Sequence, residues 1–183
     1  MRDLPDCLPR PRFTADDQQH AWDSLGANCG PGALAGMCAI TPLQAAHLMG
    51  PEFLHRRATT EIMLERALDA LDIAWTLDRG RFPVFGICRI LWAGPWTGFY
   101  DRLRHAHWVG VSATPSGHYL FDINAIAVGG WISFTEWTTA LRPWLLTTCE
   151  PLATGGWEIG EAYTIPSPFT GDCHDTVPEI HSR

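Results

Sequence analysis

The chain has 183 residues, of which 20 are acidic and 13 are basic, and its formal net charge is −7. Every basic residue is arginine, and the chain contains no lysine. This absence excludes chemistry that needs a lysine ammonium, such as a pyridoxal phosphate Schiff base or a Walker-A phosphate loop, although a coding bias toward arginine also explains it. The acidic balance argues against nucleic-acid binding, which requires a basic face.

The length fits one domain with a sizeable core. Hydrophobic residues make up 46% of the chain, including nine tryptophans, which is typical of a globule with aromatic side chains around a groove. No apolar run reaches the length of a membrane span, and the first twenty residues lack the apolar centre of a signal peptide. We therefore expect a cytoplasmic protein that does not bind membranes.

The six cysteines form no CxxC pair, which argues against a zinc ribbon or a thioredoxin-type site. The lack of a secretory signal argues against a disulfide framework. We expect most of these cysteines to be buried small side chains. The six are Cys7, Cys29, Cys38, Cys88, Cys149 and Cys173.

The order of predicted elements indicates an α+β fold, with helices first and antiparallel strands after them. Residues 1–14 predict an irregular arm, 15–165 a single domain and 166–183 a mobile tail. The predicted helices, from their caps and apolar spacing, are 15–25, one that begins near Cys29, 42–49, one from Thr59 or Thr60 to Leu71, and a short one over 135–141 before Pro143. The predicted strands are 73–77, 84–92, 107–113, 119–123 and 157–165.

One cysteine stands out by its neighbours, Asn28-Cys29-Gly30-Pro31-Gly32, at the expected start of a helix. Unsatisfied backbone N–H groups and the positive end of the helix dipole favour a thiolate there. Gly32 and Gly36, with Ala33, give this helix a face of small residues that another element can approach closely. The alternative for Cys29 is a buried, inert thiol.

A histidine follows at the start of a predicted strand, in His105-Ala106-His107-Trp108. A strand holds the His107 imidazole rigidly, as a general base must be held. His105 is better explained as a satisfied residue at a strand edge. The two histidines could form a metal pair, but no third ligand has a suitable spacing, so we expect neither a metal nor another cofactor.

The third segment, Asp122-Ile123-Asn124, lies beyond a predicted turn at 114–117. The simplest hairpin register pairs Thr114 with Gly117, which places Asn124 directly opposite His107 and Asp122 diagonally from it. Either residue could accept a hydrogen bond from the imidazole. The residues alone leave both choices open.

In this order, the three segments resemble the papain-like cysteine peptidase superfamily. The Cys-Gly-Pro helix start is similar to the bacteriocin-processing peptidase-like branch, and Phe-Asp-x-Asn is similar to the YopT-like effector peptidases. The likeness spans roughly residues 22–137. It implies a papain-like fold, with Cys29 as nucleophile, His107 as base and Asp122 as the orienting residue, Asn124 being the alternative.

The chain departs from the family at the glutamine that usually precedes the cysteine and donates to the oxyanion, because Asp23 lies in that region. We expect Asn28 or Gln19 to supply the donor instead, beside the Cys29 backbone N–H. Three tryptophans are candidates for the rim of a substrate groove, with packing in the core as the alternative. They are Trp96, Trp108 and Trp131.

The expected function is a thiol-dependent acyl-transfer enzyme, most simply a cysteine protease or isopeptidase that acts on a protein or peptide. A protein glutamine deamidase or a transglutaminase-like enzyme would use the same residues. A catalytically weak papain-like binding protein, such as an inhibitor or adaptor from a mobile element, is the alternative from another class.

Overall fold

A computed structural model describes residues 4–6, 8–26, 28–56, 58–98 and 104–167 of the chain. Helices and a six-stranded antiparallel sheet make up the fold, which confirms the α+β expectation. The strands lie in the order β1-β6-β2-β3-β4-β5. Their bounds are β1 Thr76–Arg79, β2 Phe85–Trp92, β3 Ala106–Thr114, β4 Gly117–Phe121, β5 Trp131–Ser133 and β6 Trp157–Thr164.

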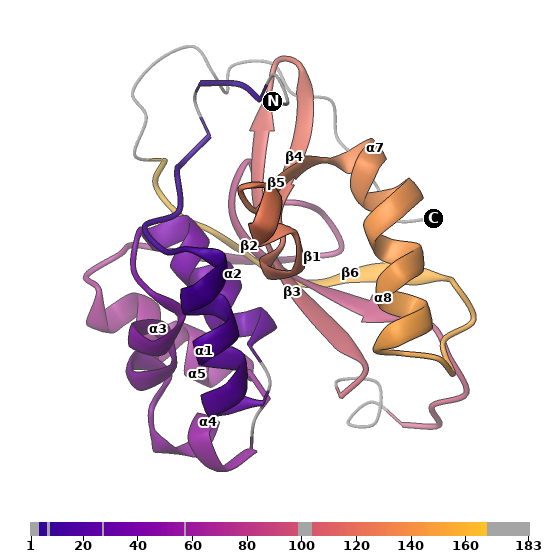
Figure 1. Cartoon of the computed structure of the whole chain (residues 1–183), viewed down its shortest axis with the longest axis horizontal. Helices are drawn as coiled ribbons and strands as arrows, with labels where there is room; N and C mark the ends of the chain where they lie inside the picture. The colour runs from indigo at the N-terminus through magenta and orange to yellow at the C-terminus, as the bar shows by residue number, and fades with distance from the viewer. Residues whose placement is uncertain (1–3, 7, 27, 57, 99–103, 168–183) are drawn as a thin grey trace.

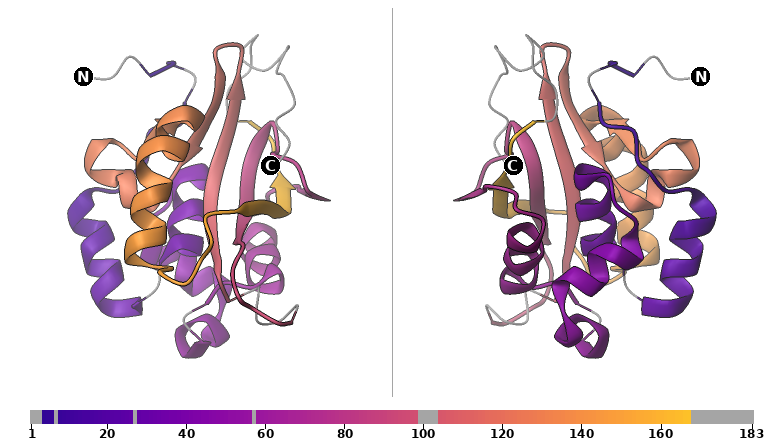
Figure 2. Two further views of the ribbon diagram at one scale, coloured as in Figure 1. Left: turned by 90° about the vertical axis from the view of Figure 1, so that its right-hand side faces the viewer. Right: turned by 90° about the vertical axis from the view of Figure 1, so that its left-hand side faces the viewer.

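The first helices of the chain gather on one face of this sheet (Figures 1 and 2). Apolar side chains of these helices form one core cluster with Phe85, Ile87 and Trp108 from the strands. The predicted helices 15–25 and 42–49 are confirmed, the helix expected up to Leu71 ends one residue earlier, and α4 was not predicted. The bounds are α1 Ala15–Leu25, α2 Cys29–Cys38, α3 Pro42–Met49, α4 Pro51–Arg56 and α5 Glu61–Ala70.

Helix α2 is the central helix, and its residues Gly30–Met37 are all buried. It begins at Cys29, as predicted. Its small-residue face allows the close approach expected from the sequence, since Gly32 faces Ile123 and Gly36 faces the ring of Phe121. Helix α2 therefore lies against the end of β4, and its first residue is brought to the sheet.

A second helical segment covers the other face of the sheet (Figure 1). It consists of α7 Phe134–Glu136, the π-helix η2 Trp137–Leu141 and α8 Arg142–Thr148, and it packs on a second core cluster that includes Val109 and Trp137. The prediction of a helix that stops before Pro143 was wrong. Pro143 directly follows the π-helix η2, and the residues before it are already helical, so the proline does not end the helical path, which continues to Thr148.

The hairpin register is as predicted, with Thr114 opposite Gly117, but β4 ends two residues early. Asp122 leaves the strand and caps a short 3-10 helix, η1 Ile123–Val128, by accepting from the Asn124 backbone N–H. An aspartate competes well for this capping role, which explains why the strand predicted up to Ile123 is cut short.

Two further differences lie at the edges of the sheet. Strand β1 begins at Thr76 rather than 73, because the Ile73 N–H donates to the Leu68 carbonyl and closes α5. Strand β5 and helix η1 were not predicted. Among the described residues, no helix is both long enough and apolar enough to cross a membrane.

The N-terminal arm has no helix or strand in its described part, as predicted, but it belongs to the core. Leu8 and Phe13 are buried, and the Trp131 indole donates to the Pro9 carbonyl at 2.6 Å. The arm thus packs on the same sheet face as α1–α5. The tail from residue 168 lies outside the described residues, so its predicted mobility stays a prediction.

The contact between α2 and β4 gives a stability prediction. Gly36→Ala would place a Cβ on top of the Phe121 ring, so we expect the free energy of unfolding to fall by about 1–3 kcal/mol. Gly98→Ala is the control, because its Cβ would meet nothing within 4 Å. Urea denaturation of both variants measures the difference, and equal stabilities would contradict the close packing of α2.

Candidate active site

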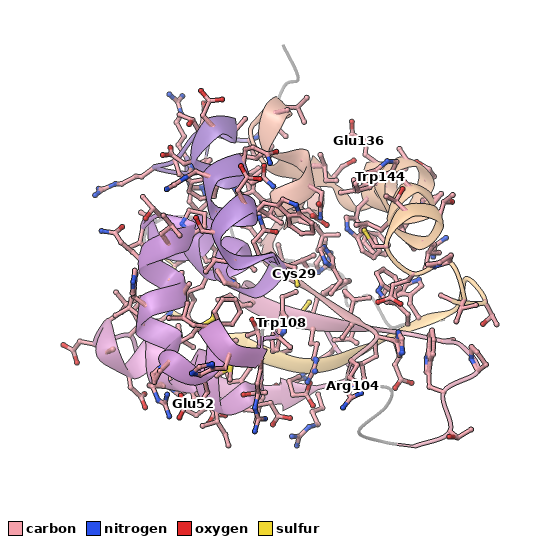
Figure 3. All side chains as sticks on the ribbon, turned by 60° about the horizontal axis from the view of Figure 1, so that its bottom comes forward. Cys29, Glu52, Arg104, Trp108, Glu136 and Trp144 are labelled. Atoms are coloured by element: carbon pink, nitrogen blue, oxygen red, sulfur yellow. The ribbon has the colours of Figure 1, made fainter. Side chains whose placement is uncertain are left out.

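The candidate site lies where the first turn of α2 meets the start of β3. The β3–β4 pairing ends at Gly110 and Phe121, so the first residues of β3 pair only with β2 on one side. There the Cys29 thiol hydrogen-bonds with the His107 side chain and accepts from the Trp108 backbone N–H. Figure 3 shows Cys29 at this end of the helix, near the centre of the molecule. The structure thus brings together the two residues that the sequence predicted as nucleophile and base.

The surroundings of Cys29 favour its ionised form. Burial opposes the charge, but the hydrogen bond and positive charge of His107, with the Trp108 N–H, outweigh it and lower the pKa of the thiol below its usual value. The sulfur also lies at the positive end of the α2 dipole. The site is therefore built to hold a thiolate.

His107 is held on two sides. Its Nε2 lies 2.7 Å from an Asp122 carboxylate oxygen, which leaves Nδ1 as the ring nitrogen for the interaction with the Cys29 thiol. The Trp92 ring stacks on the imidazole with 6.4 Å between centroids and 17° between planes. Burial opposes protonation, but Asp122 and Cys29 raise the pKa of His107 well above the ordinary value. The downward shift of the Cys29 pKa and the upward shift of the His107 pKa both favour the thiolate–imidazolium form of the pair.

Asp122 is fully buried, and both of its carboxylate oxygens are occupied. One oxygen accepts from His107 and, at 3.1 Å, from the Trp137 indole. The other accepts from the Asn124 backbone N–H at 3.0 Å and from the Asn124 side-chain amide at 2.9 Å. Burial opposes ionisation, yet His107 and these donors lower the pKa of the carboxyl group.

This arrangement separates the two candidates for the orienting residue. Asp122 contacts the imidazole directly, whereas Asn124 contacts Asp122. Continuing the hairpin register placed Asn124 opposite His107, but the strand ends before that point. Asp122 keeps an extended backbone, the chain turns into η1 after it, and its carboxylate contacts the ring instead.

The two oxyanion candidates differ in position. Asn28 is buried, lines the cleft beside Cys29, and its Nδ2 has no hydrogen-bond partner in the structure. Although Asn28 caps α2 by position, its side chain makes no capping bond, so its buried Nδ2 is an unpaired donor on a residue that lines the cleft. Gln19 was a wrong candidate, because it lies exposed on α1, bonds to Asp23 at 2.8 Å and does not line the cleft.

The prediction that Trp96, Trp108 and Trp131 form the rim of a substrate groove was wrong. Trp108 and Trp131 are core residues, each 2% exposed, with indoles that donate to the Thr59 and Pro9 carbonyls. Trp96 donates to the carbonyl of Trp92, four residues earlier, and does not line the cleft. The packing alternative therefore holds for Trp108 and Trp131.

The cleft has a volume of about 230 Å³, and its aromatic wall comes from other tryptophans. Trp22, on the last turns of α1, is 48% exposed and lines it, as does Trp92 at the end of β2. A tryptophan three residues before the end of the predicted helix 15–25 was the available signal for Trp22. The remaining lining residues that the sequence did not suggest are Gly26, Ala106, Leu145, Cys149 and Glu150.

His105 is satisfied, as expected, by Glu150 at 2.8 Å and by stacking on Trp96. The part of the chain that the structure describes contains no group of three or more His, Cys, Asp or Glu residues placed to hold a metal ion. His105 and His107 therefore contact different carboxylates, Glu150 and Asp122.

The other described cysteines are poor nucleophiles. Burial raises the pKa of Cys38 to about 12 and also raises the pKa of Cys88 and Cys149. Cys7 and Cys173 lie outside the described residues. Among the described cysteines, only Cys29 has a lowered pKa.

No protein-family model and no curated protein matches this chain. A function must therefore be inferred from the side chains of the cleft and the chemistry that they can perform. The papain-like likeness remains an expectation from the motifs.

The ionisation of Cys29 gives a pH prediction. Alkylation by iodoacetamide should label Cys29 in preference to Cys38, and its rate should persist below pH 8, because the thiol pKa is lowered. His107→Ala removes the groups that offset burial, so the pKa should rise and the rate at pH 7 should fall by about tenfold or more. Peptide mass spectrometry across pH 5–10 measures both. Equal labelling of Cys29 and Cys38 would contradict the ion pair.

A second pair of variants tests the orienting residue. Asp122→Asn removes the charge that holds the imidazolium, so the alkylation rate of Cys29 at pH 6 should fall by about tenfold or more. Asn124→Ala keeps the contact between Asp122 and His107, so its rate should fall by less than about threefold. The same alkylation assay applies to both variants. A larger loss in Asn124→Ala would make Asn124 the orienting residue.

Proposed function

We propose that this chain is a papain-like, thiol-dependent acyl-transfer enzyme that hydrolyses an amide bond in a protein substrate, as a cysteine protease or isopeptidase. The chain of contacts from the Cys29 thiol through His107 to the buried Asp122 carboxylate supports this proposal. Nucleophile, base and orienting group in this order are the parts that amide acyl transfer requires.

In the first step, the Cys29 thiolate attacks the substrate carbonyl carbon, and a C–S bond forms while the C=O electron pair moves to oxygen. The developing oxyanion needs donors already in place. The unpartnered Nδ2 of Asn28 supports this role, together with the backbone N–H of Cys29 at the start of α2. Asn28 would thus replace the glutamine that the chain lacks before its cysteine.

In the second step, the C–N bond breaks and the imidazolium of His107 gives its proton to the leaving amine. Its raised pKa keeps that proton on the ring until the amine needs it. A water then takes the place of the amine, and His107 removes its proton as the water oxygen attacks the thioester carbonyl carbon. The C–S bond then breaks, which releases the acid product and restores the Cys29 thiolate beside the protonated His107. Asp122 holds the ring in one orientation throughout, and its negative charge stabilises the imidazolium.

The features of the cleft favour this enzyme over a binding protein on a papain-like scaffold. A scaffold without activity has no need of a lowered thiol pKa or of an amide donor left unpaired beside the thiol. The unpaired amide costs folding free energy, because buried polar groups are normally paired. Perturbed ionisation in a cleft is typical of catalytic groups.

The activity is tested on a protein extract incubated with wild type, Cys29→Ala or Cys38→Ala, and read by mass spectrometry. We expect new α-amino termini or released isopeptide branches with wild type and with the Cys38→Ala control, and none with Cys29→Ala. Glutamine-to-glutamate conversion without new termini would instead make the protein a deamidase. No difference between wild type and Cys29→Ala would contradict an acyl-transfer enzyme.

Asn28→Ala separates oxyanion stabilisation from thiol reactivity in the same assay. Amide turnover should fall by about 10²–10³-fold relative to the alkylation rate of Cys29 in the same variant, because alkylation forms no oxyanion. An equal fall in both rates would assign Asn28 a purely structural role.

A further inference from the structure

A second hollow adjoins the candidate active site. It lies between η1 and the helical segment 134–148 and has a volume of about 300 Å³. Asn124 lines both this hollow and the cleft of Cys29, so the two share a wall. We call this hollow the η1 groove, and its lining residues are Asn124, Ala125, Val128, Ile132, Glu136, Ala140, Leu141 and Trp144.

The η1 groove is lined mainly by apolar side chains that remain open to solvent. Val128 is 52% exposed and Trp144 is 48% exposed, while the floor includes the buried Ile132. Figure 3 shows Trp144 and Glu136 on the same helical segment. Exposed apolar surface that is gathered in a hollow is typical of binding sites. Its volume is about twice that of a cavity that holds benzene, so a phenyl or branched aliphatic side chain fits.

The charge along the η1 groove disfavours an acidic occupant. Glu136 is the one ionisable residue in its described lining, and no arginine or histidine lines it. The cleft differs, because His107 lines it and its Glu150 is paired with His105. A carboxylate in the η1 groove would therefore lie near Glu136 without a cation, whereas an apolar group would not be repelled.

The η1 groove and the catalytic groups are built from the same elements. The π-helix η2 supplies Trp137, which donates to Asp122, and also Ala140 and Leu141, which line the η1 groove. Asn124 donates to Asp122 and separates the groove from the cleft. π-Helical turns are frequent at functional sites. A side chain in the groove would thus lie next to the residues that hold the orienting carboxylate.

We infer that the η1 groove is a specificity subsite, which binds a large apolar side chain of the polypeptide substrate close to the scissile amide. This inference rests on the proposed function. The substrate class is accordingly a polypeptide with a phenylalanine- or leucine-like residue near the cleaved bond.

The test uses symmetric trans-epoxysuccinyl bis-amides, whose two arms can extend from Cys29 in either direction. The thiolate attacks an epoxide carbon, a C–S bond forms, the ring C–O bond breaks and the oxygen takes a proton from His107. We expect the bis(phenylethyl)amide to modify wild-type Cys29 at least about tenfold faster than the bis(hydroxyethyl)amide. Its apolar arm moves out of water and into the apolar η1 groove, which favours binding. Mass spectrometry of the labelled peptide gives both rate constants.

Two variants test whether the η1 groove causes the faster reaction of the bis(phenylethyl)amide. Ala140→Trp fills the η1 groove, and Val128→Asp places a charge on its wall, so each should reduce the ratio of the two rates to near one. Leu152→Asp is the matched control, because Leu152 is 68% exposed and lines neither hollow, so it should retain the wild-type ratio. A wild-type ratio near one, or a ratio that both groove variants leave intact, overturns the subsite.

A binding measurement separates this inference from the proposed function. The unreactive succinyl bis(phenylethyl)amide is titrated into Cys29→Ala protein by calorimetry, with Cys29→Ala/Ala140→Trp as the comparison. Saturable binding that Ala140→Trp weakens supports the groove even if Cys29 proves unreactive, in which case the proposed function alone fails. Absence of binding overturns the groove. If the wild-type protein dimerises and Val128→Asp abolishes the dimer, a second copy of the chain occupies the η1 groove. That result would also overturn the subsite.

Discussion

The buried Asp122 carboxylate is the constraint on which the site depends. An ionised group without solvent exposure is tolerated only when its oxygens are paired, and this one accepts four hydrogen bonds from three residues. The donors come from β3, from η1 and from the π-helix η2. Three separate parts of the fold therefore meet at one carboxylate, and the position of His107 follows from that meeting.

The same geometry explains why a carboxylate suits this position better than an amide. Every neighbour of the side chain is an N–H donor, two on each oxygen. An asparagine would turn one NH₂ group toward two donors and leave them unpaired in a buried place. The negative charge adds a second effect, because it supports the imidazolium that a thiolate needs as its partner. Packing and chemistry thus select the same residue.

Local signals in the sequence were sufficient for much of this site. Thr14, Thr41 and Thr60 cap their helices, and Cys29 begins α2 as its flanking residues predict. The Thr114–Gly117 pairing also follows from turn chemistry. These features depend on neighbours within a few residues, so pattern and spacing determine them.

The rest depends on contacts between distant segments. Strand β4 stops at Phe121 because Asp122 caps η1 and contacts His107, and the contact with a residue 15 positions away is not visible in the local pattern. Trp108 and Trp131 were expected at a rim because their indoles suit one, but Thr59 and Pro9 supply carbonyls that satisfy them in the core. The position of a tryptophan therefore follows from which distant acceptor is in reach.

The pairing at the site also links its chemistry to folding. The lowered pKa of Asp122 stabilises the fold above the unfolded pKa of the carboxyl group, and this contribution is lost as pH falls through the folded value. The raised pKa of His107 has the opposite sign, so its contribution is full below the unfolded pKa and is lost as pH rises through the folded value. Between these limits, the charges that stabilise the fold are the charges that keep Cys29 ionised. A substitution that discharges either partner must therefore weaken the thiolate and the core together, which ties the reactivity of Cys29 to the integrity of the sheet around it.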